Sequence, residues 1–509
     1  MRPFKSTVLA AASALTLLAA HAHAAGTLRI GLNEDPDLMD PAQAGSYVGR
    51  IVFAAMCDKL VDIDSKLTLV PQLAASWAWS PDNLALTLNL RPGVTFQDGA
   101  PLDAAAVKLN LDRYRTASYS LRKGELAAVD SVEATDALTV TLKLSRPNAP
   151  LLAVLADRAG MMLSPASLDP TRGATPATIA DRPICAGPFR LTERVAQDHI
   201  TLERYPGYWD AGRVYLDRIV YRPIPNTAIK LVNLVSGQLD LIERMAASDA
   251  PAVKANPTLQ LYADPGVASQ AVLFNVAPGP AADQPFGRDA RIRRAFAMSI
   301  DRNVLNQVAF EGTQTPSNQF EAPGTPYWDP AFPVAARDVA GAKKLLAEAG
   351  QPRVALTLQV DNSPVSVQVG ELIQSMAGEA GFDVKIQAGE TNANVNAAKA
   401  GEFQAYQVIW SGRADPDGNA SIWLSKAGFL NWGSYANAEY DALLGEARTL
   451  TDPARRRALY AKADAIAQQD MPMMVLYHQT WRFAGSSKLT GFTLVPDGLI
   501  RPQGIRIAD

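Results

Sequence analysis

Two hydrophobic periods alternate along this chain, and together they determine the class of fold that it can adopt. Residues 84–90 place four leucines at every second position, and residues 138–144 repeat the alternation, which is typical of a strand with one buried face. Residues 102–114 and 289–302 instead space their apolar side chains three or four positions apart, as an amphipathic helix does. Because both patterns are interleaved throughout, the sequence predicts an α/β protein with mixed sheets flanked by helices.

Further elements continue both patterns toward the C-terminus. Short apolar runs predict strands at residues 354–360, 382–387 and 471–478. Asp103 is the expected N-terminal cap of the helix at 102–114. A helix is also predicted over residues 227–240, with one apolar face formed by Ala228, Leu231, Val232 and Val235.

The first 24 residues have the three parts of a secretory signal peptide. A basic start is followed by an apolar run at residues 8–20 and by the A-x-A cleavage site at 22–24. The apolar run is shorter than the ~20 residues needed to span a bilayer, and no cysteine begins the mature chain. We expect cleavage after Ala24 and export of a soluble protein to the periplasm.

Composition limits the partners that the chain can have. The 509 residues are 48% hydrophobic and carry a formal charge of −3, so the chain can bury a large core and form two or three domains. The nearly balanced charge argues against a nucleic-acid partner and against a polybasic membrane contact. Only Cys57 and Cys185 are available as thiols, and they either form a disulfide or remain two small buried side chains.

Motifs for catalysis and for cofactors are scarce. The sequence has no G-x-S-x-G elbow, no H-E-x-x-H and no P-loop. Ser120 begins an S-x-x-K pattern and residues 435–437 form a Y-x-N, but both are short enough to occur by chance. His199 and His478 are isolated in the sequence, and two isolated histidines do not make a metal cage. We therefore expect no catalysis, no metal site and no cofactor.

Clusters of charged and aromatic residues indicate a site for a polar small molecule, which needs a few fixed donors and acceptors among aromatic walls. Each cluster taken alone is more often structural, because tryptophan is common in cores and Asp-Pro and Asp-Gly are common in turns. The candidates are Tyr47 and Arg50 at the start of an apolar helix, Asn275, Trp410, Arg413 and Asp415 in the loop 410–419, and Trp432.

Three longer blocks, in this order, resemble one known family. Residues 71–114 contain "RPGVTFQDG", residues 186–226 contain "AGPFRLTER" and "VYLDRI", and residues 284–302 contain "PFGRDARIRRAFAMSIDR". These blocks resemble the family 5 extracellular solute-binding proteins, which are the dipeptide, oligopeptide and nickel receptors of ABC importers. The resemblance extends from about residue 27 to the end of the chain.

The resemblance implies the two-lobed periplasmic-binding-protein fold of the large class, with a hinged ligand cleft. Lobe I would comprise residues 25–267, including an inserted subdomain at about 45–183, and lobe II would comprise residues 268–478. Residues 479–509 would return to lobe I. A ligand that contacts both lobes would favour the closed state, which the membrane partner can then recognise.

The loop 410–419 departs from the pattern of the peptide receptors in this family. There, an aspartate that pairs with the peptide's α-ammonium usually stands three residues after the tryptophan. Here that position is Arg413, although Asp415 could substitute. An arginine binds a carboxylate or phosphate through its planar fork. The sequence therefore favours anionic peptides such as glutathione, opines or other carboxylate-bearing solutes over simple dipeptides.

We predict a monomeric, periplasmic substrate-binding protein of an ABC transporter. It would capture a peptide-like or carboxylate-bearing solute between its lobes and deliver it to inner-membrane permease subunits. Two alternatives remain open from the sequence. One is a secreted hydrolase on a two-lobed scaffold, which would use Ser120 or another nucleophile, and the other is a receptor for nickel or a metal chelate, which the low histidine count weakens.

Overall fold

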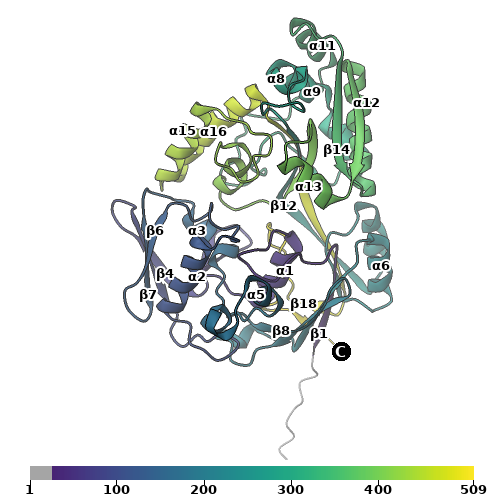
Figure 1. Cartoon of the computed structure of the whole chain (residues 1–509). Coiled ribbons are helices and arrows are strands. Elements are labelled where there is room, and N and C mark those ends of the chain that lie inside the picture. Colours follow the sequence, from purple (N-terminus) through teal and green to yellow (C-terminus); the bar gives the residue numbers. More distant parts are fainter. Residues whose placement is uncertain (1–25, 509) are drawn as a thin grey trace, which may run out of the picture.

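The computed structural model describes residues 26–508, so the predicted signal peptide 1–24 and its cleavage site lie outside the described residues. Figure 1 shows two bodies of strands and helices, and the strand β12 (Leu259–Phe274) passes from one to the other. The two-lobed, mixed α/β architecture that the sequence predicted is therefore confirmed. In the described part of the chain, no helix has both the length and the apolarity that a membrane crossing requires.

One continuous sheet joins the two lobes. Lobe I contributes β1 (Thr27–Leu32), β8 (Phe189–Val195), β9 (His199–Arg204), β10 (Arg218–Pro223) and β11 (Leu241–Ile242). Lobe II contributes β13 (Thr315–Pro316), β14 (Val354–Asp361), β15 (Phe382–Gly389) and β16 (Ala405–Trp410), while β17 (Met473–Ser486) runs beside β12 through both lobes. The order is β15-β14-β16-β12-β17-β11-β1-β10-β9-β8, with β13 paired to β17 off this path.

Strands β12 and β17 carry the chain from lobe I to lobe II and back. They pair in antiparallel fashion along most of their length, but the register shifts between Pro265 and Ser269. From Ser269 onward, β12 also pairs with β16, beginning at Trp410. Because the backbone pairing changes at this point, we propose that the lobe boundaries fall at 267/268 in β12 and at 478/479 in β17.

Lobe I contains a subdomain with a separate sheet and its own core (Figure 1). The sheet consists of β4 (Ala74–Trp79), β5 (Ala85–Leu90), β6 (Val129–Ala134) and β7 (Thr139–Leu144), in the order β4-β5-β7-β6, and α2 (Ala104–Thr116) packs against it. Three of the four leucines predicted to share a buried face, Leu86, Leu88 and Leu90, are buried in this core, whereas Leu84, which precedes β5, is 37% exposed. Asp103 caps α2 as predicted, because its side chain accepts a hydrogen bond from the Ala106 amide.

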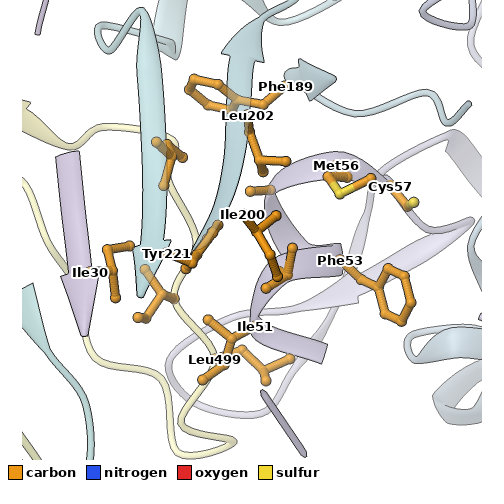
Figure 2. Packing of buried hydrophobic residues seen from close by; sticks show 14 of the residues in the cluster. Ile30, Ile51, Phe53, Met56, Cys57, Phe189, Ile200, Leu202, Tyr221 and Leu499 are labelled. Atoms are coloured by element: carbon orange, nitrogen blue, oxygen red, sulfur yellow. The ribbon is translucent and has the colours of Figure 1, made fainter. Parts of the chain in front are cut away.

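The main core of lobe I lies between its sheet and the helix α1 (Tyr47–Met56). Figure 2 shows Ile51 of this helix in one cluster with Ile200 and Leu202 of β9. Cys57 directly follows α1 and forms a disulfide with Cys185. Of the two alternatives that the sequence left open for the cysteines, the structure therefore has the disulfide, and it fixes the end of the helix that carries Arg50.

The sheet of lobe II is covered on both faces, and adjacent residues of β12 supply both cores. Phe274 belongs to the core under α9 (Ala290–Ser299), α11 (Val339–Glu348) and α12 (Pro364–Ala380), and Leu273 to the core under α15 (Ala438–Thr449) and α16 (Pro453–Asp470). Figure 1 shows these two helix groups on opposite sides of the lobe. The predicted apolar positions Ile292 and Phe296 of α9 are buried, as expected.

Helix α6 (Thr227–Val235) forms where it was predicted, but the predicted apolar face is wrong. Val232 and Val235 are 66% and 56% exposed, whereas Lys230 and Leu234 are buried. The ammonium group of Lys230 donates a hydrogen bond to the Glu243 carbonyl oxygen at 2.6 Å. The buried ammonium group finds hydrogen-bond acceptors inside the lobe. The face of α6 that packs against the lobe therefore carries Lys230, and the face that carries the valines is exposed.

Candidate functional site

A cavity of about 230 Å³ opens between the two lobes, beside the loop that follows β16. We call it the interlobe pocket. Lobe I lines it with parts of the segment 124–157, which includes the short helix α3 (Leu151–Val154). Lobe II lines it with parts of the loop 410–429 and with Arg448. Three residues singled out from the sequence share this second wall, namely Trp410, Arg413 and Asp415.

The wall from lobe II is held in shape by Asn419, which no sequence pattern indicated. Its side-chain oxygen accepts hydrogen bonds from the Trp410 indole at 3.0 Å and from the Arg413 amide at 2.7 Å. Its amide group donates to the Arg413 carbonyl oxygen at 3.0 Å. Gly412 has a φ of +73°, and a β-carbon there would lie 2.3 Å from the Val267 carbonyl oxygen. Glycine is therefore required where this loop meets β12.

Arg413 connects the two lobes. The centre of its guanidinium lies 4.4 Å from the centre of the Trp410 ring, which is a cation–π contact. Its Nε lies 2.8 Å from one carboxylate oxygen of Asp157 in lobe I. Nε of Arg50, from α1, lies 3.1 Å from the other oxygen of the same carboxylate. Asp157 thus holds one arginine from each lobe, although the sequence reasoning did not identify it as a site residue.

Further hydrogen bonds join the lobes around this carboxylate. Arg50 donates to the hydroxyl oxygen of Ser411 at 3.3 Å, and Arg413 donates to the same oxygen at 3.2 Å. The Ala149 amide donates to the Arg448 carbonyl oxygen at 2.7 Å. The two lobes are therefore in direct contact beside the pocket, as they are in the closed state of a hinged binding protein.

Positive charge is in excess around Asp157. Burial by itself would raise the pKa of this carboxyl group, but nearby guanidinium groups outweigh burial and hold the pKa well below its usual value. These groups belong to Arg413, Arg50, Arg158 and Arg122. Arg122 pairs with Glu125 at 2.7 Å. Within the described residues, the Nε atoms of Arg122 and Arg158 have no hydrogen-bond partner.

The crowding also acts on the arginines themselves. Burial, together with neighbouring guanidinium charges, lowers the pKa of Arg158 to about 9 and the pKa of Arg413 to about 10. Four guanidinium groups thus form ion pairs with two carboxylates, those of Asp157 and Glu125. Asp497, which is paired with Arg501, also acts on Arg50, but the guanidinium groups still outnumber the carboxylates around Asp157. An anionic group of a ligand would reduce this repulsion and would find a planar donor fork.

The acidic residues of the loop already have partners within lobe II. Asp415 accepts hydrogen bonds from both Nη atoms of Arg456, at 2.7 and 2.8 Å. Asp417 accepts a hydrogen bond from Nε of Arg448 at 2.7 Å. A ligand ammonium group would have to displace one of these arginines, so the loop is better suited to an anion than to a cation.

The other residues singled out from the sequence are not among those that line the pocket in the described part of the chain. Tyr47 stacks on Trp481, with ring centres 5.0 Å apart, and its hydroxyl donates to the Gly498 carbonyl. Asn275 is buried, and its amide donates to two backbone carbonyls. Trp432 packs in the core under α15 and α16. These three side chains have structural contacts.

Residues considered for catalysis or metal binding also have structural contacts. Ser120 is buried and donates to the Tyr114 carbonyl at 2.7 Å. His199 pairs with acidic neighbours at the surface of its strand. His478 is buried, Nε2 lies 3.1 Å from the Gln319 carbonyl oxygen, and burial lowers the pKa of this histidine to about 4. Among the described residues, no three His, Cys, Asp or Glu side chains are grouped to hold a metal ion.

Two lobes with a small charged pocket between them are typical of a class of solute-binding proteins. The model of the bacterial extracellular solute-binding proteins, family 5, matches residues 68–431. The chain belongs to this family, as the resemblance of its sequence blocks had indicated. It is therefore a substrate-binding protein of ABC transport, a class that has no catalytic activity of its own.

Three known proteins illustrate the similarity. The glutathione-binding protein GsiB of Pectobacterium atrosepticum is 30% identical over 475 residues, which are 91% of this chain and 90% of that protein. The binding protein AgaA from A. tumefaciens R10, solved in complex with agropinic acid, has a TM-score of 0.84 and 25% identity, covering 95% of this chain and 99% of its own. AppA of Bacillus subtilis, solved with a nonapeptide, has a TM-score of 0.84 at 22% identity over the same shares of the two chains, which shows the common fold.

Proposed function

We propose that this protein captures a peptide-like solute with a carboxylate group in the interlobe pocket and delivers it to an ABC permease of the inner membrane. It would act in the periplasm as a monomer, after removal of residues 1–24. The observation that carries the proposal is the excess of guanidinium groups around Asp157, at the contact between the lobes.

The size of the pocket and the relatives support the same ligand class. A cavity of about 230 Å³ is smaller than the roughly 300–1,000 Å³ typical of pockets for drug-sized ligands, so a short solute fits better than a long peptide. GsiB is named as a glutathione-binding protein, and AgaA was solved with agropinic acid. Both of these ligands carry carboxylate groups.

A ligand carboxylate can take over the contact that Asp157 makes with Arg413. Asp157 would keep its contact with Arg50, so neither carboxylate would be left without a cation. Since Arg413 belongs to lobe II and Arg50 to lobe I, the ligand would join the two lobes and favour the closed state through its differential affinity. The exchange leaves the loop backbone unchanged, because Asn419 anchors it independently.

Native mass spectrometry of gently purified protein is the first test, because a tightly bound solute would be retained and weighed. A thermal-shift panel of glutathione, opines, dipeptides and organic acids then ranks the ligand classes, since a ligand of the folded state raises its stability. A panel in which dipeptides without an additional acidic group stabilise the protein most would contradict the proposal.

Two single substitutions test the site, because only one of them should weaken binding. Arg413→Ala should weaken binding of an anionic ligand by about 1.5–3 kcal/mol, the range for hydrogen bonds to charged groups. Asp157→Asn should leave binding unchanged or make it tighter, because it removes the carboxylate that competes for Arg413. Isothermal titration calorimetry measures both, with thermal melts to verify folding. Unchanged affinity in Arg413→Ala, or an equal loss in both variants, would contradict the proposed site.

A further inference from the structure

The interlobe pocket contains a positive charge that the protein itself does not neutralise. Arg146 lines the pocket from lobe I, and its side chain is exposed. Among the side chains that the structure describes, Arg146 has no hydrogen-bond or ion-pair partner. The other charged side chains that line the pocket all have one, and they are Glu125, Asp157, Arg413, Asp415, Asp417 and Arg448.

Arg146 is separated from the Asp157–Arg413 contact by the helix α3. Arg146 follows β7 and precedes α3, whereas Asp157 comes after α3, and a helix of this length spans about 6 Å. Ala149, which follows Arg146 closely, makes a backbone hydrogen bond to lobe II. Arg146 therefore stands beside a second point where the lobes touch. Apolar side chains also line the pocket, including Val154 from lobe I and Ile422 and Phe429 from lobe II.

We infer that Arg146 binds a second acidic group of the ligand, so that the preferred solute is a short peptide-like molecule with two acidic groups joined by an uncharged segment. The inference rests on the proposed function. A guanidinium without a partner is a ready donor for a carboxylate. The acidic lining residues of the same segment are already paired, Glu125 with Arg122 at 2.7 Å and Asp157 with Arg413 at 2.8 Å.

The two arginines have different surroundings, and this difference gives the inference a second readout. Arg146 is exposed, whereas the guanidinium of Arg413 is largely buried against Trp410 and Asp157. Dissolved salt screens exposed charges strongly and buried charges weakly. The contribution of Arg146 to binding should therefore shrink when the ionic strength is raised, while the contribution of Arg413 should change little.

The experiment crosses protein variants with chemically blocked ligands. The variants are Arg146→Ala and, as a matched control, Lys123→Ala, which removes an equal charge from an exposed position that is not among the pocket-lining residues of the described chain. The probes are glutathione and two forms of it in which one or the other carboxylate is esterified. Calorimetry at low and high salt gives the dissociation constant for each combination.

We expect Arg146→Ala to weaken glutathione binding about three- to tenfold at low salt and Lys123→Ala to weaken it by less than about twofold. One of the two esters should bind the wild type more weakly than glutathione does, yet bind Arg146→Ala as well as glutathione does. Unchanged binding by Arg146→Ala, or a full penalty for both esters in that variant, would overturn the inference alone. A wild type that binds none of the carboxylate-bearing solutes would overturn the proposed function and this inference together.

Discussion

Two arginine–aspartate pairs begin in the same loop, two residues apart, but they join different parts of the molecule. Arg413 reaches Asp157 of lobe I at 2.8 Å, whereas Asp415 accepts hydrogen bonds from Arg456 of α16, within lobe II. The first pair bridges the two lobes, whereas both members of the second pair belong to lobe II. The Arg413–Asp157 pair, which joins the lobes, is therefore suited to being replaced by a contact with a ligand. The Asp415–Arg456 pair, which lies within lobe II, maintains the fold of that lobe.

The geometry of the two pairs agrees with this division. Asp415 uses both oxygens, and Arg456 also donates to the Tyr327 hydroxyl at 2.8 Å. Asp157 instead divides its oxygens between Arg50 and Arg413. A bidentate buried pair is costly to break, while a carboxylate shared by two arginines keeps one of them when the other is taken by a ligand.

The largest effect should come from breaking the pair within lobe II. Asp415→Ala would leave the Arg456 guanidinium buried without its carboxylate, and we expect the free energy of unfolding to fall by about 3–5 kcal/mol. Urea denaturation followed by circular dichroism measures this. The double variant with Asp415→Leu and Arg456→Met should recover most of the loss, because it removes both charges. A loss below about 1 kcal/mol in Asp415→Ala, typical of surface pairs, would refute the structural assignment.

An intermediate effect is expected from a second acid of lobe II, which lacks the kind of partner that Asp415 has. Burial, with the negative charge of Asp329, raises the pKa of Asp464 on α16 to about 7. Burial also raises the pKa of Glu321, with Asp464 and Asp415 contributing to the rise. Since the folded pKa of Asp464 exceeds the unfolded value, this group lowers the stability of the fold progressively as the pH rises from about 4 to about 7.

Asp464→Asn should therefore be more stable than the wild type at pH 8, by an amount on the order of 2 kcal/mol, and the difference should decrease toward pH 4. Urea denaturation at pH 4.5, 6 and 8 follows this change. Glu446→Gln, at an exposed position of α15, is the control and should show no such trend. A stability difference that is constant with pH, or that increases toward low pH, would disprove the protonation of Asp464.

The smallest effect should come from changing the shape of the cation at the contact between lobes while retaining its charge. Arg413→Lys keeps a positive group near Asp157 but loses the planar fork and part of the stacking on Trp410. We expect ligand affinity to fall by about 1 kcal/mol, less than in Arg413→Ala, with the unfolding free energy nearly unchanged. If the lysine and alanine variants bound the ligand equally weakly, geometry would outweigh charge at this position.

Much of the fold could be predicted from the sequence because local patterns dictate local structure. The alternating leucines of β5 are buried as predicted, and Asp103 caps α2. Helix α6 shows the limit of such patterns. Its valines have helical spacing, but the buried face belongs to Lys230, whose ammonium finds hydrogen-bond acceptors supplied by other segments of lobe I. Periodicity detects an apolar stripe but does not reveal what the opposite face meets.

Of the residues proposed from the sequence, Trp410, Arg413 and Asp415 line the interlobe pocket, while their role in binding stays a prediction. Arg413 could be singled out because turn residues and the family pattern mark its loop. Asn419 was overlooked, because an asparagine after Asp-Gly is already explained by turn chemistry. Asn275 has a polar side chain of the kind that often binds ligands, yet its amide group donates hydrogen bonds to two backbone carbonyls. Whether a polar side chain is free or occupied depends on neighbours that are distant in the sequence.

By itself, the sequence determined the α/β class, the family and the unusual arginine in the loop after β16, because each of these depends on residues that are close together in the chain. Only the tertiary structure decided that Arg413 meets Asp157, that Asp415 is occupied by Arg456, and that Arg146 is left without a partner. Ion pairs between lobes depend on how two separately folded surfaces dock. The charged groups available to a ligand are those that have no ion-pair partner once the two lobes have docked.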